Sequence, residues 1–172
     1  MLKNIIVTGG LGFIGSNLIE FLLKKKYSVI NIDKVTYSSN FYNVKNFKSD
    51  KKYSFIKCDI GDNKIKKIFF KYKPLCIFNL AAETHVDRSI DDPKNFINSN
   101  IVSVYNLLEN FKKFSKKYNS KLIHVSTDEV FGDILKGRSS EEYPYKPSSP
   151  YAASKAASDH LINSYIRTYK LP

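Results

Sequence analysis

Four of the seven glycines in this 172-residue chain lie between positions 9 and 15, and this cluster constrains the fold more than any other feature of the sequence. It follows the short apolar run 3–8 (KNIIVT) and precedes a stretch, 13–26, whose apolar side chains recur with helical spacing. Glycine tolerates tight turns and allows the backbone to approach another group closely. The pattern therefore predicts a buried strand, a tight turn and a helix in direct succession.

Within the turn, Gly9, Gly12 and Gly15 form a GxxGxxG spacing. Between a strand and a helix, this spacing is typical of a dinucleotide-binding turn. The first glycine permits the turn, the second lets the backbone approach a pyrophosphate, and the third allows close packing of the helix on the strand. The N-terminus of the helix also presents free N–H groups to the phosphates. We therefore expect a dinucleotide at this turn.

Asp33 indicates which dinucleotide to expect. It closes the second predicted strand, 28–32, and lies 18 residues after Gly15, where a carboxylate can accept a hydrogen bond from a ribose hydroxyl of the adenosine. A carboxylate at this position repels a 2′-phosphate, so we predict NAD rather than NADP. The adjacent Lys34 makes that preference moderate.

Strand and helix patterns alternate along the rest of the chain. The pairs Asp92-Pro93 and Ser149-Pro150 are typical helix starts, with an N-cap side chain followed by proline at the first helical position. We predict an α/β fold, a Rossmann-like doubly wound parallel sheet with right-handed crossovers. The expected strands are 3–8, 28–32, 53–57, 75–80 and 121–126, and the expected helices are 13–26, 62–72, 93–118 and 151–169.

The cysteines and the apolar residues exclude several classes of protein. Only Cys58 and Cys76 are present, and no CxxC or Cys/His spacing occurs, so we expect neither a disulfide framework nor a metal site. No segment approaches 18 consecutive apolar residues, and the apolar run at the N-terminus is too short for a signal peptide. We expect one domain in a soluble cytoplasmic protein without a membrane segment.

The net charge of +12 would ordinarily favour a nucleic acid or an anionic membrane as partner. However, only three of the 28 basic residues are arginine, the side chain on which phosphate and base recognition mainly depends. The lysines fall in short clusters near the predicted helix ends, where cations complement the helix dipole. We therefore interpret the charge as a solvated surface and expect no nucleic-acid partner.

Polar residues stand at the ends of the predicted strands, where ligands bind in an open parallel sheet. Asp59-Ile60 follow the third strand, residues 81–85 (AAETH) the fourth, and residues 126–129 (STDE) the fifth. All six alanines of the chain occur at 81–82 and within 152–157. Since small residues are rare elsewhere, we expect the backbone to approach a ligand at both places.

Tyr151 and Lys155 lie one helical turn apart at the start of the last predicted helix. A lysine ammonium there would favour the tyrosinate and lower the phenol pKa from its usual value of about 10. The tyrosine could then take a proton from a hydroxyl group while a hydride leaves the same carbon.

The glycine pattern together with YxxxK resembles the extended short-chain dehydrogenase/reductases that act on nucleotide sugars. Within that superfamily, three segments resemble the dTDP-glucose 4,6-dehydratases: AAETHVDRSI (81–90), VSTDEVFGD (125–133) and SPYAASKAASDHL (149–161). The discriminating element is the pair Asp128-Glu129, because the related epimerases and decarboxylases tend to lack an acid at position 128.

The resemblance implies NAD-dependent dehydration of dTDP-glucose to its 4-keto-6-deoxy product. The sugar is oxidised at C4, water is lost across C5–C6, and hydride returns to C6. Two adjacent carboxyl groups in one pocket can hold unequal pKa values, as an acid and a base require. The implied catalytic residues are Tyr151 (base for the C4 hydroxyl) with Lys155, Thr127 (hydrogen bond to the C4 oxygen), Glu129 (base at C5) and Asp128 (acid for the C6 hydroxyl).

The cofactor contacts carried over from the resemblance and the glycine turn form a larger set. Ser99 and Phe131 depart from the threonine and tyrosine that we expect at those positions, and Thr84, Thr127, Asp128 and Glu129 are expected to contact the substrate. The expected cofactor-binding residues are Gly9, Gly12, Phe13, Ile14, Gly15, Asp33, Lys34, Thr36, Asp59, Ile60, Leu80, Ala81, Ala82, Thr84, Ser99, Ser126, Tyr151 and Lys155. His124 and His160 are expected to have core or surface roles.

The resemblance also implies a smaller C-terminal domain that binds the nucleotide sugar. We find nothing that corresponds to it and expect residues 1–172 to be a NAD-binding Rossmann domain truncated before its last strands, with weak NAD binding and little turnover. The helices 93–118 and 151–169 are expected to form the face of a homodimer.

Two other functions remain open at this point. One is a nucleotide-sugar 4-epimerase or decarboxylase of the same superfamily. The other is a non-catalytic NAD-binding module whose lysine clusters recruit an acidic partner, which would show steep dependence of binding on salt concentration.

Overall fold

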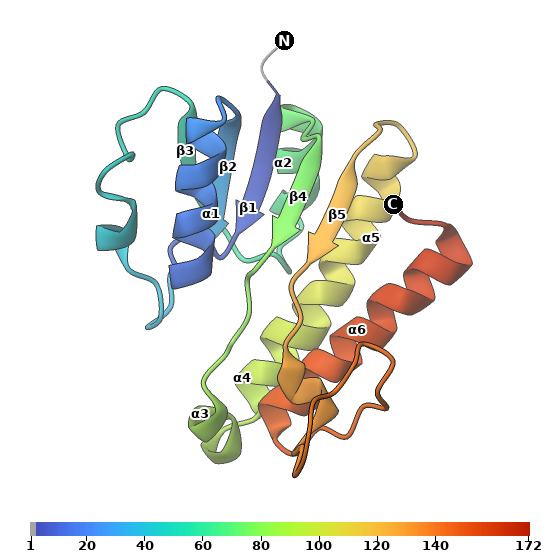
Figure 1. The fold of residues 1–172 in the computed structure, drawn as a ribbon. Helices are drawn as coiled ribbons and strands as arrows, with labels where there is room; N and C mark the ends of the chain where they lie inside the picture. The colour runs from blue at the N-terminus through green and yellow to red at the C-terminus, as the bar shows by residue number, and fades with distance from the viewer. Residues whose placement is uncertain (1–2) are drawn as a thin grey trace.

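Five parallel strands in the order β3-β2-β1-β4-β5 form the sheet of the computed structural model, which describes residues 3–172 (Figure 1). Every neighbouring pair of strands is parallel. This order confirms the predicted doubly wound sheet, and the predicted strands agree with the structure to within two residues at each end. The strands are β1 (Asn4–Thr8), β2 (Ser28–Asp33), β3 (Tyr53–Lys57), β4 (Cys76–Asn79) and β5 (Lys121–His124).

The strand order reverses between β1 and β4. The chain builds β1, β2 and β3 outward in one direction and then returns to place β4 on the other side of β1. In such a sheet the connections leave a crevice at the carboxyl ends of the two central strands. The loops that follow β1 and β4 therefore face each other at this edge.

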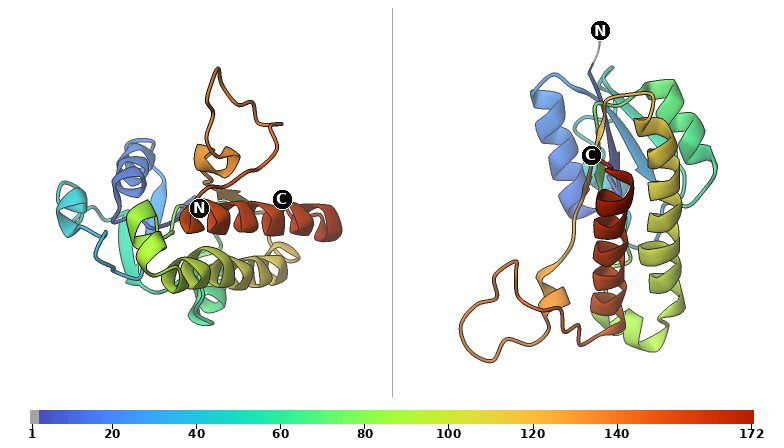
Figure 2. Two further views of the ribbon diagram at one scale, coloured as in Figure 1. Left: turned by 90° about the horizontal axis from the view of Figure 1, so that it is seen from below. Right: turned by 90° about the vertical axis from the view of Figure 1, so that its right-hand side faces the viewer.

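Alternating side chains of β1 divide the core into two layers. Ile6 packs into the larger layer, with side chains of α2 and α5, whereas Ile5 and Val7 pack into the other layer, with side chains of α1. Figure 2 shows α1 on one side of the sheet and α2 and α5 on the other. Because both faces are covered, β2 is buried along its whole length, which explains its nearly continuous apolar sequence. The main helices are α1 (Phe13–Lys24), α2 (Lys64–Tyr72), α5 (Ser103–Ser115) and α6 (Pro150–Tyr169).

The start of α6 confirms the predicted cap. Ser149 Oγ accepts a hydrogen bond from the backbone N–H of Ala152 at 3.0 Å, and Pro150 occupies the first helical turn. Asp92 also behaves as a helix-start residue, because its carboxylate accepts from the backbone N–H of Lys94 at 3.2 Å.

The predicted helix 93–118 is confirmed as a continuous helical segment from Lys94 to Ser115, but its middle is π-helical instead of α-helical. The structure divides it into α4 (Lys94–Phe96), the π-helical turn η2 (Ile97–Val102) and α5. A further short helix, α3 (Val86–Asp91), precedes it and was not predicted. A π turn leaves no periodic signal in the sequence, because it is stabilised by tertiary contacts of the residues it displaces.

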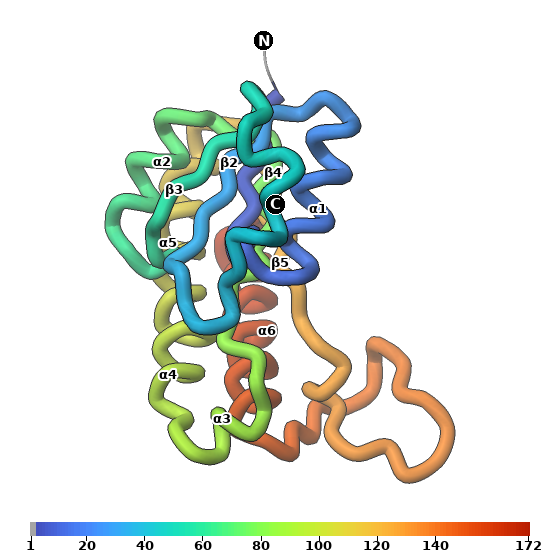
Figure 3. Tube along the Cα trace, turned by 90° about the vertical axis from the view of Figure 1, so that its left-hand side faces the viewer, coloured from blue at the N-terminus to red at the C-terminus, as the bar shows by residue number. Residues whose placement is uncertain are grey.

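Two single-turn 3₁₀ helices occur in the long connections: η1 (Phe41–Val44) and η3 (Asp128–Phe131). The loop between η3 and α6 extends away from the rest of the chain (Figures 2 and 3). Both cysteines are free thiols. Among the helices formed by residues 3–172, none combines the length and apolar character needed to cross a bilayer.

Candidate active site and dinucleotide cavity

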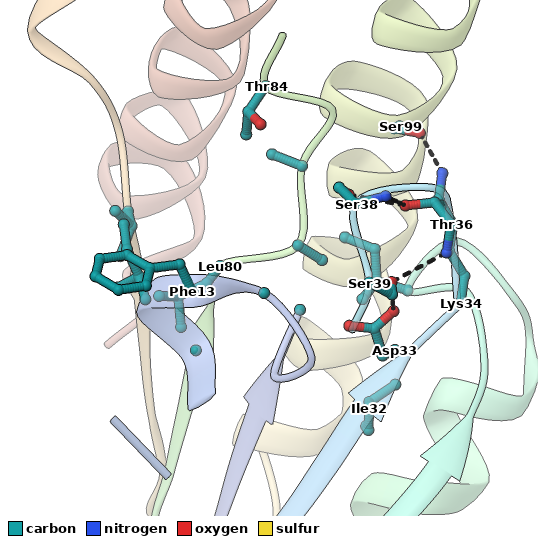
Figure 4. Close-up of a pocket in the computed structure, with 18 of the residues that line it drawn as sticks. Phe13, Ile32, Asp33, Lys34, Thr36, Ser38, Ser39, Leu80, Thr84 and Ser99 are labelled. Carbon is teal, nitrogen blue, oxygen red and sulfur yellow. Dashed lines mark hydrogen bonds between the residues drawn. The ribbon is translucent and has the colours of Figure 1, made fainter. Parts of the chain in front are cut away.

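A cavity of about 530 Å³ opens at the carboxyl edge of the sheet. Its wall combines the glycine turn after β1, the segments that follow β2, β3, β4 and β5, and the start of α6. Figure 4 shows part of this wall, with Phe13 at the start of α1 and Asp33 at the end of β2. The crevice expected from the strand order is therefore a cavity of the size that small-molecule ligands occupy.

All 18 residues expected to bind the cofactor line this one cavity. Five further lining residues were missed: Ile32, Ser38, Ser39, Cys58 and Val125. Each of these lies within three positions of a residue that was predicted, so the strand ends located the wall but not its full extent. Of the substrate residues, Thr84 and Thr127 line the cavity, and Asp128 and Glu129 do not.

The glycine turn is shaped by backbone contacts. Gly9 has a φ of +69°, and a Cβ there would lie 2.9 Å from the backbone of Leu80 and Ala81. A Cβ on Gly15 would lie 2.4 Å from the carbonyl oxygen of Gly9, whereas one on Gly12 would meet only that oxygen, at 3.3 Å. The fold itself therefore requires glycine at positions 9 and 15, and the face of Gly12 is open.

The N-terminus of α1 fits an anionic group. Its N-cap is Gly12, which provides no side-chain hydrogen bond, and its first turn contains no acidic residue. The first N–H groups of a helix have no partner within the helix, and the helix dipole favours negative charge there. Phe13 and Ile14 carry these groups at the cavity wall. The residues present thus fit a pyrophosphate at this end of the cavity.

Asp33 is held firmly at the end of β2. Its carboxylate accepts hydrogen bonds from the backbone N–H of Leu11 at 3.1 Å, the backbone N–H of Val35 at 2.8 Å and the hydroxyl of Ser39 at 2.8 Å. The side chain is therefore fixed in the cavity wall beside the glycine turn, as a ribose-binding carboxylate must be.

Lys34 turns toward the opposite wall, as Figure 4 shows. Its Nζ donates to the hydroxyl of Ser99 at 2.6 Å and lies 3.5 Å from the carboxylate of Glu83 and 3.9 Å from that of Asp59. These partners already satisfy the ammonium, so it is not placed to neutralise a phosphate beside Asp33. Lys34 therefore does not weaken the preference for NAD over NADP that Asp33 indicates.

The loop after β4 is clamped by Asn100, a residue that sequence analysis missed. Asn100 lies in the π turn and is 1% exposed. Its amide accepts from the backbone N–H of Glu83 at 2.9 Å and donates to the carbonyl oxygen of Glu83 and to the hydroxyl of Ser154, each at 2.9 Å. The π turn therefore ties the loop that carries Ala82 and Thr84 to α6.

Tyr151 and Lys155 are both almost completely buried, at 7% and 4% exposure. Lys155 Nζ donates to the carbonyl oxygen of Val125 at 2.6 Å and lies 3.4 Å from Nε2 of His124. Burial lowers the pKa of Lys155, and the nearby charge of Asp159 acts in the opposite direction. The ammonium therefore points to the end of β5.

The prediction that Lys155 lowers the pKa of Tyr151 is wrong in this structure. Burial raises the pKa of Tyr151, and the negative charges of Glu129 and Asp128 raise it further, while a hydrogen bond with Thr127 opposes them. The ammonium of Lys155 instead donates to the carbonyl oxygen of Val125, at the end of β5.

His124 is half-buried in β5 and contacts polar groups on both sides of its ring. Its Nδ1 lies 2.8 Å from the side-chain nitrogen of Asn79, and its Nε2 faces Lys155. Burial and the charge of Lys155 lower the pKa of His124 to about 3. The ring is therefore neutral at physiological pH.

The two candidate acid–base carboxylates lie at the rim. Asp128 and Glu129 are exposed in η3, directly after Thr127, and form no part of the cavity wall. Thr127 caps this turn by accepting from the backbone N–H of Glu129 at 3.3 Å. Their negative charges act on Tyr151, whose pKa both of them raise.

Known protein sequences resemble this chain over almost its whole length. A sequence profile of the family described as GDP-mannose 4,6 dehydratase matches residues 6–172. The dTDP-glucose 4,6-dehydratase of Haemophilus influenzae is 47% identical, over 99% of this chain and 54% of that protein. The enzyme of the same name from Neisseria gonorrhoeae is 42% identical, over 99% of this chain and 52% of that protein. The chain thus spans about half the length of the curated relatives it matches.

Solved structures agree with these relatives. DesIV, a dTDP-glucose 4,6-dehydratase from Streptomyces venezuelae with NAD and TYD bound, has a TM-score of 0.91 and 38% identity, over 98% of this chain and 53% of that chain. The UDP-glucose 4-epimerase of Thermus thermophilus in complex with NAD has a TM-score of 0.86 and 32% identity, over 98% of this chain and 52% of that chain. The resemblance inferred from the motifs is confirmed. Because the profile match extends over almost the whole chain and the fold agrees with it, the chain belongs to the GDP-mannose 4,6-dehydratase family.

Proposed function

We propose that this chain is the cofactor-binding part of a NAD-dependent dehydratase that converts dTDP-glucose to dTDP-4-keto-6-deoxyglucose. The observation that carries the proposal is a single cavity lined both by the glycine turn and by Thr127, Tyr151 and Lys155. The relatives named as dTDP-glucose 4,6-dehydratases support the reaction and the substrate.

The NAD would be held by the residues that the cavity brings together. The N–H groups at the start of α1 would bind the pyrophosphate, Asp33 the adenosine ribose, and Lys155 a hydroxyl near the reacting end. Bound NAD⁺ would supply a hydride acceptor, a positive charge beside Tyr151 and, after reduction, the hydride that is returned.

The chain's own residues would then move the protons. Tyr151 would take the proton of the C4 hydroxyl, with Thr127 as a hydrogen-bond donor to that oxygen. Glu129 would take the proton from C5, and Asp128 would protonate the hydroxyl that leaves C6 as water. The C5 proton returns when hydride returns to C6, so the reaction is a net loss of one water without net oxidation.

The raised pKa of Tyr151 has a consequence for this scheme. Burial and two carboxylates oppose formation of the tyrosinate. A positive charge near the phenol would favour the tyrosinate, and NAD⁺, when bound, would bring one to the cavity. We expect proton transfer from the substrate to depend on occupation of the cofactor end of the cavity.

A turnover assay tests the proposal. We would incubate dTDP-glucose with this chain and with the gene product that carries it, and follow the 4-keto-6-deoxy product by its absorbance in alkali. We expect NAD binding by the chain, and turnover that requires residues beyond the half-length shared with its relatives. Bound NAD without turnover in the gene product would contradict the dehydratase assignment.

A 4-epimerase is the second candidate, favoured by two observations: Asp128 and Glu129 lie outside the cavity wall, and the epimerase of Thermus thermophilus has a closely similar fold. The two reactions differ in their need for an acid. Asp128→Asn should abolish water loss in a dehydratase, whereas a 4-epimerase should tolerate it. A non-catalytic NAD-binding module would instead bind NAD and an acidic partner, with affinity that falls steeply as salt is added.

The proposal includes a homodimer in the cytoplasm. Five large apolar side chains of the helical layer formed by η2, α5 and α6 are 46–49% exposed: Ile97, Val102, Tyr105, Ile166 and Tyr169. Their position on the helices predicted to form the dimer face supports association through this layer. Light scattering over a range of protein concentrations tests the dimer.

The free thiols of Cys58 and Cys76 are compatible with a reducing compartment.

A further inference from the structure

Asp159 is a buried carboxylate for which the proposed reaction has no role. It lies on α6 one turn after Lys155 and two turns after Tyr151, so the three side chains share one face of the helix. Asp159 is only 9% exposed and forms no part of the cavity wall. Ionisable side chains are rarely buried to this degree unless they are paired.

The partners of Asp159 are two hydroxyl groups from different segments. Its Oδ2 accepts a hydrogen bond from the hydroxyl of Ser126, and the same oxygen accepts from the phenol of Tyr145 at 3.1 Å. Ser126 directly precedes Thr127, and Tyr145 belongs to the loop that extends between η3 and α6. One carboxylate oxygen therefore joins both sides of η3 to the helix that carries Tyr151.

The segment that carries Tyr145 also packs directly against η3 and the glycine that follows it. The backbone N–H of Lys146 donates to the carbonyl oxygen of Val130 at 2.9 Å. A Cβ on Gly132 would lie 2.0 Å from the carbonyl oxygen of Lys146, so the backbone at Lys146 lies directly against Gly132. The ring of Phe131 packs edge-on against Tyr145 at 5.4 Å between centroids. A contact that restrains both Ser126 and Tyr145 therefore also restrains η3.

A second contact reinforces the first at the end of β5. Lys155 Nζ holds the carbonyl oxygen of Val125, and Asp159 holds the side chain of the next residue. Through these hydrogen bonds, two successive turns of α6 hold the two residues that directly precede Thr127.

We propose that Asp159 is a positioning residue, which holds Thr127, Asp128 and Glu129 at the distance from Tyr151 that proton transfer requires by fixing Ser126 on one side of η3 and Tyr145 on the other. The catalytic part of this inference rests on the proposed function, whereas the restraint on η3 does not.

Three variants separate the possible roles. Asp159→Ala removes the acceptor and leaves both hydroxyls unpaired. Asp159→Asn removes the charge but keeps a carbonyl oxygen of the same size and position, which can accept from both hydroxyls. Glu142→Ala is the matched control, because it removes an exposed carboxylate from the same loop, for which residues 3–172 provide no hydrogen bond or ion pair.

The first measurement is hydrogen exchange followed by mass spectrometry on this chain. We expect Asp159→Ala to increase exchange in peptides that cover 126–132 and 143–148, with no change in β1 or β2. Asp159→Asn and Glu142→Ala should match the unmodified chain. Unchanged exchange in Asp159→Ala would overturn the proposal. If that variant fails to fold, Tyr145→Phe decides, because loss of one donor should loosen 143–148.

The second measurement is turnover of dTDP-glucose by the gene product that carries this chain. We expect Asp159→Ala to lower kcat about 10- to 100-fold, the cost of misplacing a catalytic group by about 1 Å, while the Kd for NAD stays within about twofold. Asp159→Asn should restore most of kcat. A loosened η3 with an unchanged kcat would overturn the positioning role, and so would an equal loss in the asparagine variant. If the unmodified protein shows no turnover, the proposed function fails, and hydrogen exchange alone decides the restraint.

Discussion

The ammonium of Lys155 donates a hydrogen bond to the backbone oxygen of Val125 at 2.6 Å. This contact fixes the lysine between the last strand of the sheet and the cavity, in the wall where a cofactor ribose would lie. Replacement of the lysine should therefore affect both the end of β5 and ligand binding.

We expect Lys155→Met to weaken NAD binding at least tenfold, because a hydrogen bond to a charged group contributes about 1.5–3 kcal/mol. Methionine fills most of the same space but cannot donate to the carbonyl oxygen of Val125, so the free energy of unfolding should also fall, by about 1–3 kcal/mol. Calorimetric titration of the chain with NAD measures the first effect, and thermal unfolding the second. An unchanged Kd would show that the lysine serves only the fold.

Gly12 and Gly15 should respond differently to alanine. A Cβ on Gly15 would lie 2.4 Å from the oxygen of Gly9, so Gly15→Ala should lower the free energy of unfolding by about 1–3 kcal/mol. A Cβ on Gly12 would meet the protein only at the oxygen of Gly9, at 3.3 Å, and would point to the face where a pyrophosphate would approach. We expect Gly12→Ala to lose NAD binding, with a smaller decrease of its unfolding midpoint in urea than Gly15→Ala shows. Equal stability loss in the two variants would contradict this division.

His124 should make stability depend on pH. Its pKa is about 3 in the folded chain and about 6.5 in the unfolded chain, so the unfolded chain takes up a proton first as the pH falls. The stabilisation is complete above pH 6.5 and decreases below it, by about 1.4 kcal/mol per pH unit for one proton.

The window between pH 6 and pH 5 isolates this effect, because most carboxylates remain ionised there. We expect urea unfolding to show a decrease in stability across this window, and His124→Gln to flatten it. His85→Gln, at an exposed histidine, should leave the slope unchanged. A slope that persists in His124→Gln would assign it to other groups.

Tyr151→Phe should separate binding from chemistry. The ring packs edge-on against Phe96 at 6.3 Å between centroids, and phenylalanine preserves that contact. We expect NAD affinity and the melting temperature to be retained, and kcat in the gene product to fall about 10²- to 10⁴-fold, the usual contribution of a positioned general base. Retained turnover would exclude the phenol as the base.

Local signals predicted much of the fold. The glycine spacing, the Ser149 cap and the apolar runs each act within a few residues, so they located the strands, the turn and the start of α6. The π turn and α3 were missed, because the clamp made by Asn100 involves Glu83 and Ser154, which are distant in sequence. A side chain that bonds across such separations leaves no pattern in its own neighbourhood.

The candidate site, like the fold, could be predicted only in part from the sequence. The residues at the carboxyl ends of the strands could be predicted from the sequence alone, because strand positions and side-chain types follow from local pattern, and all of the expected cofactor residues line one cavity. How the charges of these residues act depends on the folded arrangement. Burial and partner choice direct Lys155 to Val125 instead of Tyr151 and Lys34 to Ser99, and they join Asp159 to Ser126 and Tyr145. These effects depend on distances and desolvation that exist only once distant segments have packed together.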